Sequence, residues 1–245
     1  CILITVQVTY LTVDSVTEGV GRSQIVPVVN GLSRRGWRVR LVSCEKNASL
    51  LEEVAPELEP TIDFRAVAFG TSGARGAVSR LRRLRKMALP ADIIHCRSDQ
   101  PLLAALGRRD GPPVIWDSRS FWAEQKVATG ILKSGSLSFR GANALEGIGA
   151  RRTEAMASLS QAGLDAMAAK WGTIPSRTLV SPTLVDTSHF RPQPWQARSS
   201  VEVLFSGTYN AYYDLELSAA FIARLGTLRP VSTTWASGHE AQETS

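Results

Sequence analysis

The sequence predicts a mixed α/β protein in which a doubly wound parallel sheet is followed by a second, smaller Rossmann-like segment. Short runs of β-branched residues alternate with longer helical patterns, which is typical of βαβ units and a parallel sheet. Glycine or proline stands where several helical patterns end, as at Gly36 and Pro90. Near residue 190 a segment rich in proline and glutamine interrupts the alternation, and a new strand pattern follows it.

The first domain accounts for most of these elements. Apolar, β-branched runs predict strands at residues 2–8, 37–43, 62–69, 92–96, 114–116, 155–159 and 178–181. Helical spacing, such as that of Ile25, Val28, Val29 and Leu32, predicts helices at residues 23–35, 75–89, 101–106, 136–153 and 161–171. We therefore expect an N-terminal domain at residues 1–190.

The rest of the chain predicts a linker at residues 191–200 and an incomplete second domain at residues 201–245. Strand patterns at 201–205 and 231–235 flank a helical pattern at 215–225. A lone unit of about this length does not bury its own apolar faces, so we expect a truncated domain. The start at Cys1, inside an apolar run, also favours a fragment.

Composition narrows the partners and the compartment. The formal charge of +6 and the pI of about 9.6 favour phosphates, anionic lipids or nucleic acid. No finger or homeodomain pattern is present, so we expect no nucleic-acid partner. Three cysteines without a CxxC pair, no signal-peptide pattern and no apolar run of about 20 residues favour a reduced, cytoplasmic protein.

A glycine-bearing segment, Gly19 to Gly21, precedes the first helical pattern. Glycines let a backbone approach a phosphate, and the following helix start offers free N–H groups. The spacing is neither GxGxxG nor that of a P-loop, so a turn without a ligand stays open as the alternative.

A second candidate segment runs from Trp116 to Trp122 after a predicted strand. Aromatic rings there could stack on a sugar or lipid, Asp117 could accept hydrogen bonds from hydroxyls, and Arg119 could bind phosphate. The alternative is that Asp117 caps a helix while the aromatic rings fill the core.

Histidines and carboxylates do not show the spacing of a metal site. His95 alternates with Ile94 in a predicted strand, which favours a core histidine. No Asp-x-Asp pair occurs, which argues against a metal-chelating type of sugar-nucleotide site. We expect neither a protein-bound metal nor a cofactor.

The helical pattern at residues 75–89 is strongly basic. Val78, Leu81, Leu84 and Met87 predict one apolar face, and the remaining positions carry basic residues: Arg80, Arg82, Arg83, Arg85 and Lys86. Such a helix could lie on an anionic membrane surface, on the inner face of the membrane. The alternative is a helix that covers the sheet and exposes a solvated basic face.

Taken in order, these segments resemble family 4 of the retaining glycosyltransferases, which have the GT-B fold. The resemblance rests on five segments: Gly19–Pro27 with Leu32–Val39, Ile94–Ser98, Val114–Arg119, Ser181–Pro192 and Val203–Thr208. It covers nearly the whole chain. The segment Val185-Asp186 to Phe190 is similar to the signature at the end of the family's N-terminal lobe.

The resemblance implies an enzyme that transfers a sugar from a nucleotide-diphosphate sugar, its co-substrate, to a glycan or lipid-linked acceptor. It also implies that the transfer needs no metal and retains the configuration at the anomeric carbon. Such a reaction would belong to polysaccharide or glycolipid biosynthesis. The residues expected to contact donor phosphates are Gly19, Gly21, Ser206, Gly207 and Thr208. The expected catalytic residues are Asp117 and Arg119, and the expected acceptor-binding residues are Ser23, Gln24, Arg97 and Trp122.

The sequence departs from the family pattern after Gly207. Thr208 to Asp214 stand where many relatives carry an Arg and a Lys, and the family's paired glutamates would lie beyond the chain. We therefore expect this chain alone to lack turnover. Two other functions stay open: a sugar-nucleotide epimerase of GT-B shape, and a non-catalytic binding fragment.

Overall fold

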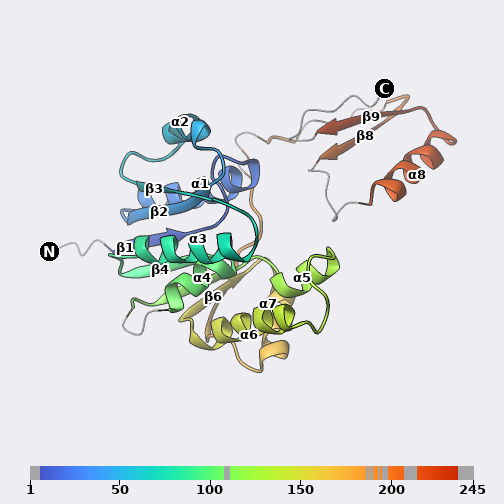
Figure 1. Ribbon diagram of the computed structural model, residues 1–245. Helices are drawn as coiled ribbons and strands as arrows, with labels where there is room; N and C mark the ends of the chain where they lie inside the picture. Colours follow the sequence, from blue (N-terminus) through green and yellow to red (C-terminus); the bar gives the residue numbers. More distant parts are fainter. Residues whose placement is uncertain are drawn as a thin grey trace. The chain divides into compact units, whose positions relative to one another are not determined.

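The chain forms two compact units, residues 1–186 and residues 187–245 (Figure 1). The computed structural model describes residues 6–107, 111–185, 187, 190–192, 194, 198–206 and 214–236. The division at 1–190, 191–200 and 201–245 remains a prediction.

The first unit contains a seven-stranded sheet in the order β3-β2-β1-β4-β5-β6-β7. All its neighbouring strands pair in parallel. The strands are β1 (Gln7–Leu11), β2 (Arg38–Glu45), β3 (Asp63–Ala68), β4 (Ile93–Arg97), β5 (Val114–Ser118), β6 (Ala155–Ser158) and β7 (Arg177–Val180). This order confirms the doubly wound parallel sheet.

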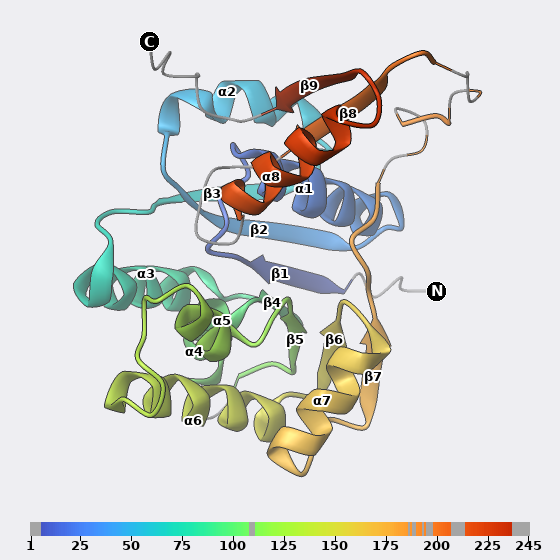
Figure 2. The same cartoon turned by 90° about the vertical axis from the view of Figure 1, so that its right-hand side faces the viewer.

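Helices connect these strands (Figure 2). The buried apolar residues form two separate cores. The α-helices of the first unit are α1 (Gly19–Arg34), α2 (Leu51–Val54), α3 (Gly73–Met87), α4 (Asp99–Leu106), α5 (Trp122–Ala128), α6 (Leu137–Arg152) and α7 (Gln161–Trp171). Single 3-10 turns, Ala48–Leu50 and Ala55–Glu57, flank α2. Ile25 of α1 packs with Tyr10 and Leu41 in one core, while Leu84 of α3 packs with Trp116 in the other.

Helix α1 begins earlier than the sequence predicts. Arg22 N donates a hydrogen bond to Glu18 O over 2.8 Å, so Gly19 and Gly21 lie in the first turn of α1 and not in a preceding loop. A Cβ added to Gly21 would lie 2.0 Å from Ser15 O. Gly21 therefore allows the helix to pack closely on the chain that enters it.

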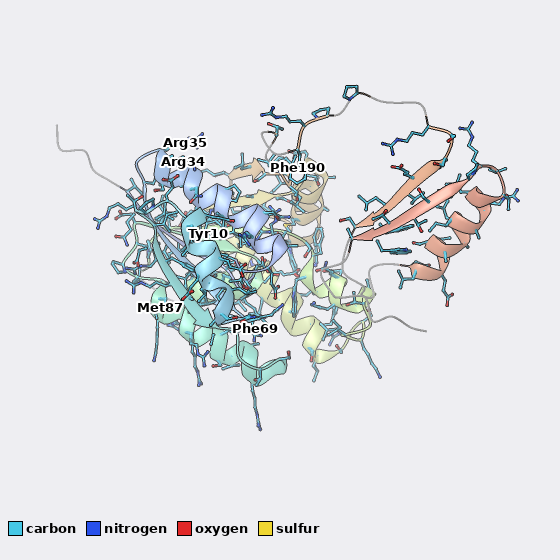
Figure 3. All side chains as sticks on the ribbon, turned by 90° about the horizontal axis from the view of Figure 1, so that it is seen from above. Tyr10, Arg34, Arg35, Phe69, Met87 and Phe190 are labelled. Carbon is cyan, nitrogen blue, oxygen red and sulfur yellow. The ribbon has the colours of Figure 1, made fainter. Side chains whose placement is uncertain are left out.

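The predicted apolar face of α3 is confirmed for Leu81 and Leu84, which pack on the core, and is wrong for Val78 and Met87. Val78 and Met87 are 47% and 41% exposed, whereas Arg80 is only 5% exposed. The buried residues recur every fourth position, at Gly76, Arg80, Leu84 and Ala88. Arg80 can be buried because its guanidinium lies 4.0 Å from the Phe69 ring centre and donates hydrogen bonds to Phe69 O and Thr71 O. Figure 3 labels Phe69 and Met87 near this helix.

Two helical segments had no counterpart in the sequence prediction: α5 and the turns around α2. Both are short, so hydrophobic periodicity has little chance to develop in them. Strand β1 extends to Leu11, three residues beyond the predicted end at Val8. The predicted start of that strand, residues 2–5, lies outside the described residues.

The second unit contains β8 (Val201–Ser206), α8 (Leu215–Gly226) and β9 (Val231–Ala236). β8 and β9 pair in parallel, and Phe205 stacks on Trp235 with ring centres 4.1 Å apart. The side chain of Asp214 accepts a hydrogen bond from Leu217 N and caps α8. These elements form the predicted βαβ unit of a second Rossmann-like segment.

Candidate functional site

A cavity of about 380 Å³ opens at the carboxyl ends of the strands of the first unit. The strand order reverses between the neighbours β1 and β4, and open α/β sheets bind ligands at such a switch point. The cavity is lined by Val13, Asp14, Val20, Gln24, Arg97, Ser98, Asp99, Gln100, Arg119, Ser120, Trp122, Gln125, Leu159 and Thr183.

Gln24, on α1, joins two arginines at the wall of this cavity. Its side-chain oxygen accepts hydrogen bonds from Arg97 Nη2 over 2.6 Å and from Arg119 Nη2 over 3.0 Å. Arg97 ends β4 and Arg119 follows β5. One carboxamide therefore fixes the positions of two cations that come from different strands.

Arg97 is held on every side. Its side chain is 5% exposed, and its Nε donates a hydrogen bond to Asp14 Oδ2 over 2.9 Å. Its Nη1 lies 3.6 Å from Asp117 Oδ2. Together with the bond to Gln24, all three guanidinium nitrogens have partners, so Arg97 is part of a fixed wall.

Arg119 is held more loosely. Its Nη1 lies 3.5 Å from Asp117 Oδ1 and 3.4 Å from Ser181 O, and its Nη2 lies 3.4 Å from Thr183 Oγ1. These distances are long for hydrogen bonds. Arg119 is 15% exposed, which leaves it better placed than Arg97 to pair with a bound group.

Asp117 lies beneath the two arginines and does not line the cavity. Its buried carboxylate faces Arg97, Arg119 and, over 3.8 Å, His95 Nε2. Burial acts to raise its pKa, but His95, Arg119 and Arg97 together outweigh burial and hold the pKa below its usual value. Asp117 is therefore an anion that orients cations, and it is not the helix cap of the alternative interpretation, because it lies within β5.

His95 is a partly buried residue of the sheet. Its ring stacks on Tyr10 with ring centres 4.4 Å apart, and the two residues are register partners on β4 and β1. Figure 3 labels Tyr10 within the first unit. Nε2 of His95 is buried without a hydrogen-bond partner among the described residues, and it lies 3.8 Å from Asp117 Oδ2. These contacts match the expectation of a core histidine.

Asp99 is a cavity residue that sequence reasoning missed. Burial, and then the charge of Glu146, raise its pKa to about 7, although Lys170 opposes this rise. Glu146 is itself held by Lys170 Nζ over 3.1 Å and by Ala123 N over 3.0 Å. Asp99 follows Ser98, whose φ of 72° is rarely adopted outside glycine. No signal in the sequence indicates the raised pKa of Asp99 or the positive φ of Ser98.

A second missed residue, Glu45, organises the segment that joins β1 to α1. Its buried carboxylate accepts hydrogen bonds from Val16 N over 3.1 Å and from Thr17 Oγ1 over 3.1 Å, and also from the hydroxyls of Ser15 and Ser43. This segment carries Asp14 at its start and leads into α1. A charged residue at the end of an apolar strand could have indicated Glu45 in advance.

The structure brings together part of the predicted site. Gln24, Arg97, Arg119 and Trp122 line one cavity, with Asp117 directly below. Gly19, Gly21 and Ser23 do not line it, and the Ser23 hydroxyl donates to Val20 O. Ser206 ends β8 in the second unit, while Gly207 and Thr208 lie outside the described residues.

The described part of the chain offers no group of three His, Cys, Asp or Glu side chains arranged to hold a metal ion. Of the helices described here, none combines the length and apolar character needed to cross a membrane.

Solved structures of low sequence identity share the fold. One is a Listeria monocytogenes protein described as a UDP-N-acetylglucosamine 2-epimerase, at 12% identity and a TM-score of 0.66, with 98% of this chain and 64% of that chain covered. Sucrose-phosphate synthase of Thermosynechococcus elongatus has 10% identity, a TM-score of 0.66 and the same coverage. Anabaena HepE, solved with UDP and glucose, has 12% identity and a TM-score of 0.61, with 95% of this chain and 70% of that chain covered.

The chain thus spans about 64% of the length of the first two structures. These similarities establish a GT-B-like α/β fold. A search of the curated proteins returns no match. The family model for the glycosyl transferase 4-like domain matches residues 21–183, which include most of α1, all of β4 and β5, and the arginines of the cavity. The chain therefore belongs to the glycosyl transferase 4-like domain family.

Proposed function

We propose that this chain is the acceptor-side part of a glycosyltransferase that moves a sugar from a nucleotide-diphosphate donor to a glycan or lipid-linked acceptor. The observation that carries the proposal is the cavity at the sheet's switch point, where Gln24, Arg97, Arg119 and Trp122 converge. Family membership supports sugar transfer as the reaction. The complex of HepE with UDP and glucose supports a nucleotide-sugar donor.

In this proposal the residues have separate tasks. Trp122 offers an aromatic surface to the acceptor, and Gln24 with Arg97 forms the fixed wall beside it. Arg119 is the catalytic residue, because its bonds to Ser181 O and Thr183 Oγ1 are long and it can turn toward negative charge that develops only in the transition state, without binding a phosphate in the ground state. Asp117 acts as a positioning residue, because it contacts both arginines but does not itself line the cavity.

The mechanism we propose is retention at the anomeric carbon without a chelated metal, as the family resemblance implies. Gly19 and Gly21 remain candidates for the donor-phosphate side through the N-terminus of α1, with Ser206, Gly207 and Thr208 as candidates from the second unit. Since Gly21 packs against Ser15 O, Gly19 is the more accessible of the two glycines.

The test measures sugar transfer by the full-length protein from UDP-, ADP- and GDP-sugars, with products identified by mass spectrometry with and without acceptor. We expect an acceptor-dependent product, and a loss of at least about 100-fold in Arg119→Gln. Arg34→Gln, at the exposed end of α1, is the matched control and should retain activity. Interconversion of donors without an acceptor would instead show an epimerase, and no donor turnover would leave only a binding role.

We also propose that α3 places the protein on an anionic membrane surface from the cytoplasmic side, as suits a lipid-linked acceptor in polysaccharide or glycolipid synthesis. Arg75, Arg82 and Lys86 are exposed on one stripe of α3, and the helix contains no acidic residue. Each basic side chain near such a surface contributes about 1 kcal/mol. Because the opposite side of α3 packs on the core, the interaction would be electrostatic and would not bury the helix in lipid.

Vesicle sedimentation tests this membrane role. We expect the protein to bind vesicles that contain phosphatidylglycerol and not vesicles of phosphatidylcholine alone. Changing Arg75, Arg82 and Lys86 together to Gln should abolish the preference for phosphatidylglycerol. Changing three exposed arginines elsewhere to Gln, namely Arg34, Arg38 and Arg177, should leave this preference intact. Equal binding by both triple variants would contradict a specific role of α3.

A further inference from the structure

Although the cavity holds two arginines, their positive charges are already matched. Asp14 and Asp117 supply two carboxylates to Arg97, and Asp117 also faces Arg119. A dianionic phosphate would have to displace one of these carboxylates or be repelled by it. The sequence suggested that Arg119 binds phosphate, but the guanidinium of Arg119 already faces a carboxylate and is not an unpaired cation.

Another residue that lines the cavity adds negative charge. Asp99 lines the same cavity, and burial raises its pKa to about 7, so that its carboxyl group becomes an anion as the pH rises above neutral. Glu146 and Lys170 are the charged groups that act on Asp99 from α6 and α7. Above neutral pH, where Asp99 is ionised, the carboxylates of Asp14, Asp99 and Asp117 outnumber the two guanidinium groups in and beside the cavity.

The remaining polar lining is neutral and can both donate and accept hydrogen bonds. It consists of carboxamides and hydroxyls beside one indole ring: Gln24, Gln100, Gln125, Ser98, Ser120, Thr183 and Trp122. A sugar ring presents hydroxyls that both donate and accept, together with a C–H face that suits an aromatic surface. Carboxylates such as Asp14 and Asp99 accept hydrogen bonds strongly from hydroxyls.

We infer that the group of the acceptor that enters this cavity is an uncharged, hydroxyl-bearing ring and not a phosphate. This inference rests on the proposed function, because it defines which part of the acceptor the cavity holds. A phosphate elsewhere on a lipid-linked acceptor would then stay outside the cavity. Specificity would come from hydroxyl positions, read by Asp14, Asp99 and the carboxamides.

The experiment follows the indole signal of Trp122 in proton–nitrogen spectra, assigned with the Trp122→Phe variant. The probes are a panel of neutral methyl glycosides and disaccharides, and separately inorganic phosphate and glycerol 3-phosphate at the same ionic strength and pH. We expect at least one neutral glycoside to shift the signal, with affinity reduced about tenfold in Asp14→Ala, and we expect neither phosphate to shift it. Asp165→Asn, an exposed aspartate on α7, is the control that should bind normally.

A variant with two carboxylates neutralised makes the test independent of any one sugar. The double variant Asp14→Asn and Asp99→Asn keeps the shapes but removes two carboxylates, so it should gain phosphate binding that depends on Arg119. Phosphate binding by the unaltered protein, lost in Arg119→Gln, would overturn the inference while leaving the cavity as an acceptor site. If neither class of probe moved the Trp122 signal, the inference and the acceptor role of the cavity would both fail.

Discussion

Arg119 Nη2 donates a hydrogen bond to Gln24 Oε1 over 3.0 Å, although 95 positions separate the two residues in sequence. This bond joins α1 to the segment after β5, and the same oxygen also holds Arg97. The geometry of the candidate site therefore depends on one neutral side chain.

Replacing that side chain tests the dependence. Gln24→Met keeps the length but removes the acceptor, so both guanidinium groups lose a partner. We expect unfolding in urea to show a loss of about 1–3 kcal/mol, and we expect sugar transfer by the full-length protein to fall at least about tenfold. Gln161→Met, exposed on α7, should change neither quantity. Full transfer activity in Gln24→Met would show that the arginines do not need this anchor.

The two glycines at the start of α1 should respond differently to alanine. Gly21→Ala places a Cβ 2.0 Å from Ser15 O and should cost roughly 2–3 kcal/mol of unfolding free energy. A Cβ added to Gly19 would meet no heavy atom within 4 Å, so Gly19→Ala should be neutral or slightly stabilising. Thermal or urea unfolding of both variants measures the contrast. Equal effects would mean that close packing is not what places glycine at position 21.

Two arginines on α3 should also differ. Arg80→Ala removes a buried guanidinium from Phe69 O and Thr71 O and from the face of the Phe69 ring, and we expect a loss of about 2–3 kcal/mol. Arg82→Ala changes an exposed position and should stay within about 0.5 kcal/mol of the unaltered chain. Urea unfolding at neutral pH distinguishes them. A stable Arg80→Ala variant would refute the structural role that its burial indicates.

The pKa of Asp99 predicts how stability changes with pH. The folded state holds this proton up to about pH 7, whereas the unfolded chain, with an ordinary pKa of 3.8, loses it earlier. Between these values the folded state binds more protons, so the contribution of Asp99 to the free energy of unfolding falls as the pH rises. Asp99→Asn removes this pH dependence. We expect the change in unfolding free energy caused by Asp99→Asn to be roughly 1–3 kcal/mol more favourable at pH 8 than at pH 4.

Urea unfolding at pH 4, 6 and 8 measures this effect, with Asp165→Asn as the exposed control. The control should follow the unaltered chain at all three values. If Asp99→Asn followed it as well, Asp99 would titrate normally in the folded state and its burial would carry no energetic cost.

Much of the fold was predictable because it rests on local patterns. Parallel strands buried on both faces read as continuous apolar runs, and all seven strands of the first unit lie at or next to predicted positions. Gln24, Arg97, Arg119 and Trp122 were also predictable, since polar residues at strand ends and helix starts of such a sheet converge at one edge.

The hydrophobic pattern and the strand-end residues by themselves determined the doubly wound sheet and the edge at which its site lies. Tertiary structure alone decided that Arg80 is buried while Met87 is exposed, that Asp117 contacts both arginines of the cavity, and that burial and Glu146 raise the pKa of Asp99. The physical reason is that burial and charge pairing arise between residues far apart in sequence, as between Asp99, Glu146 and Lys170, and no local pattern records those distances.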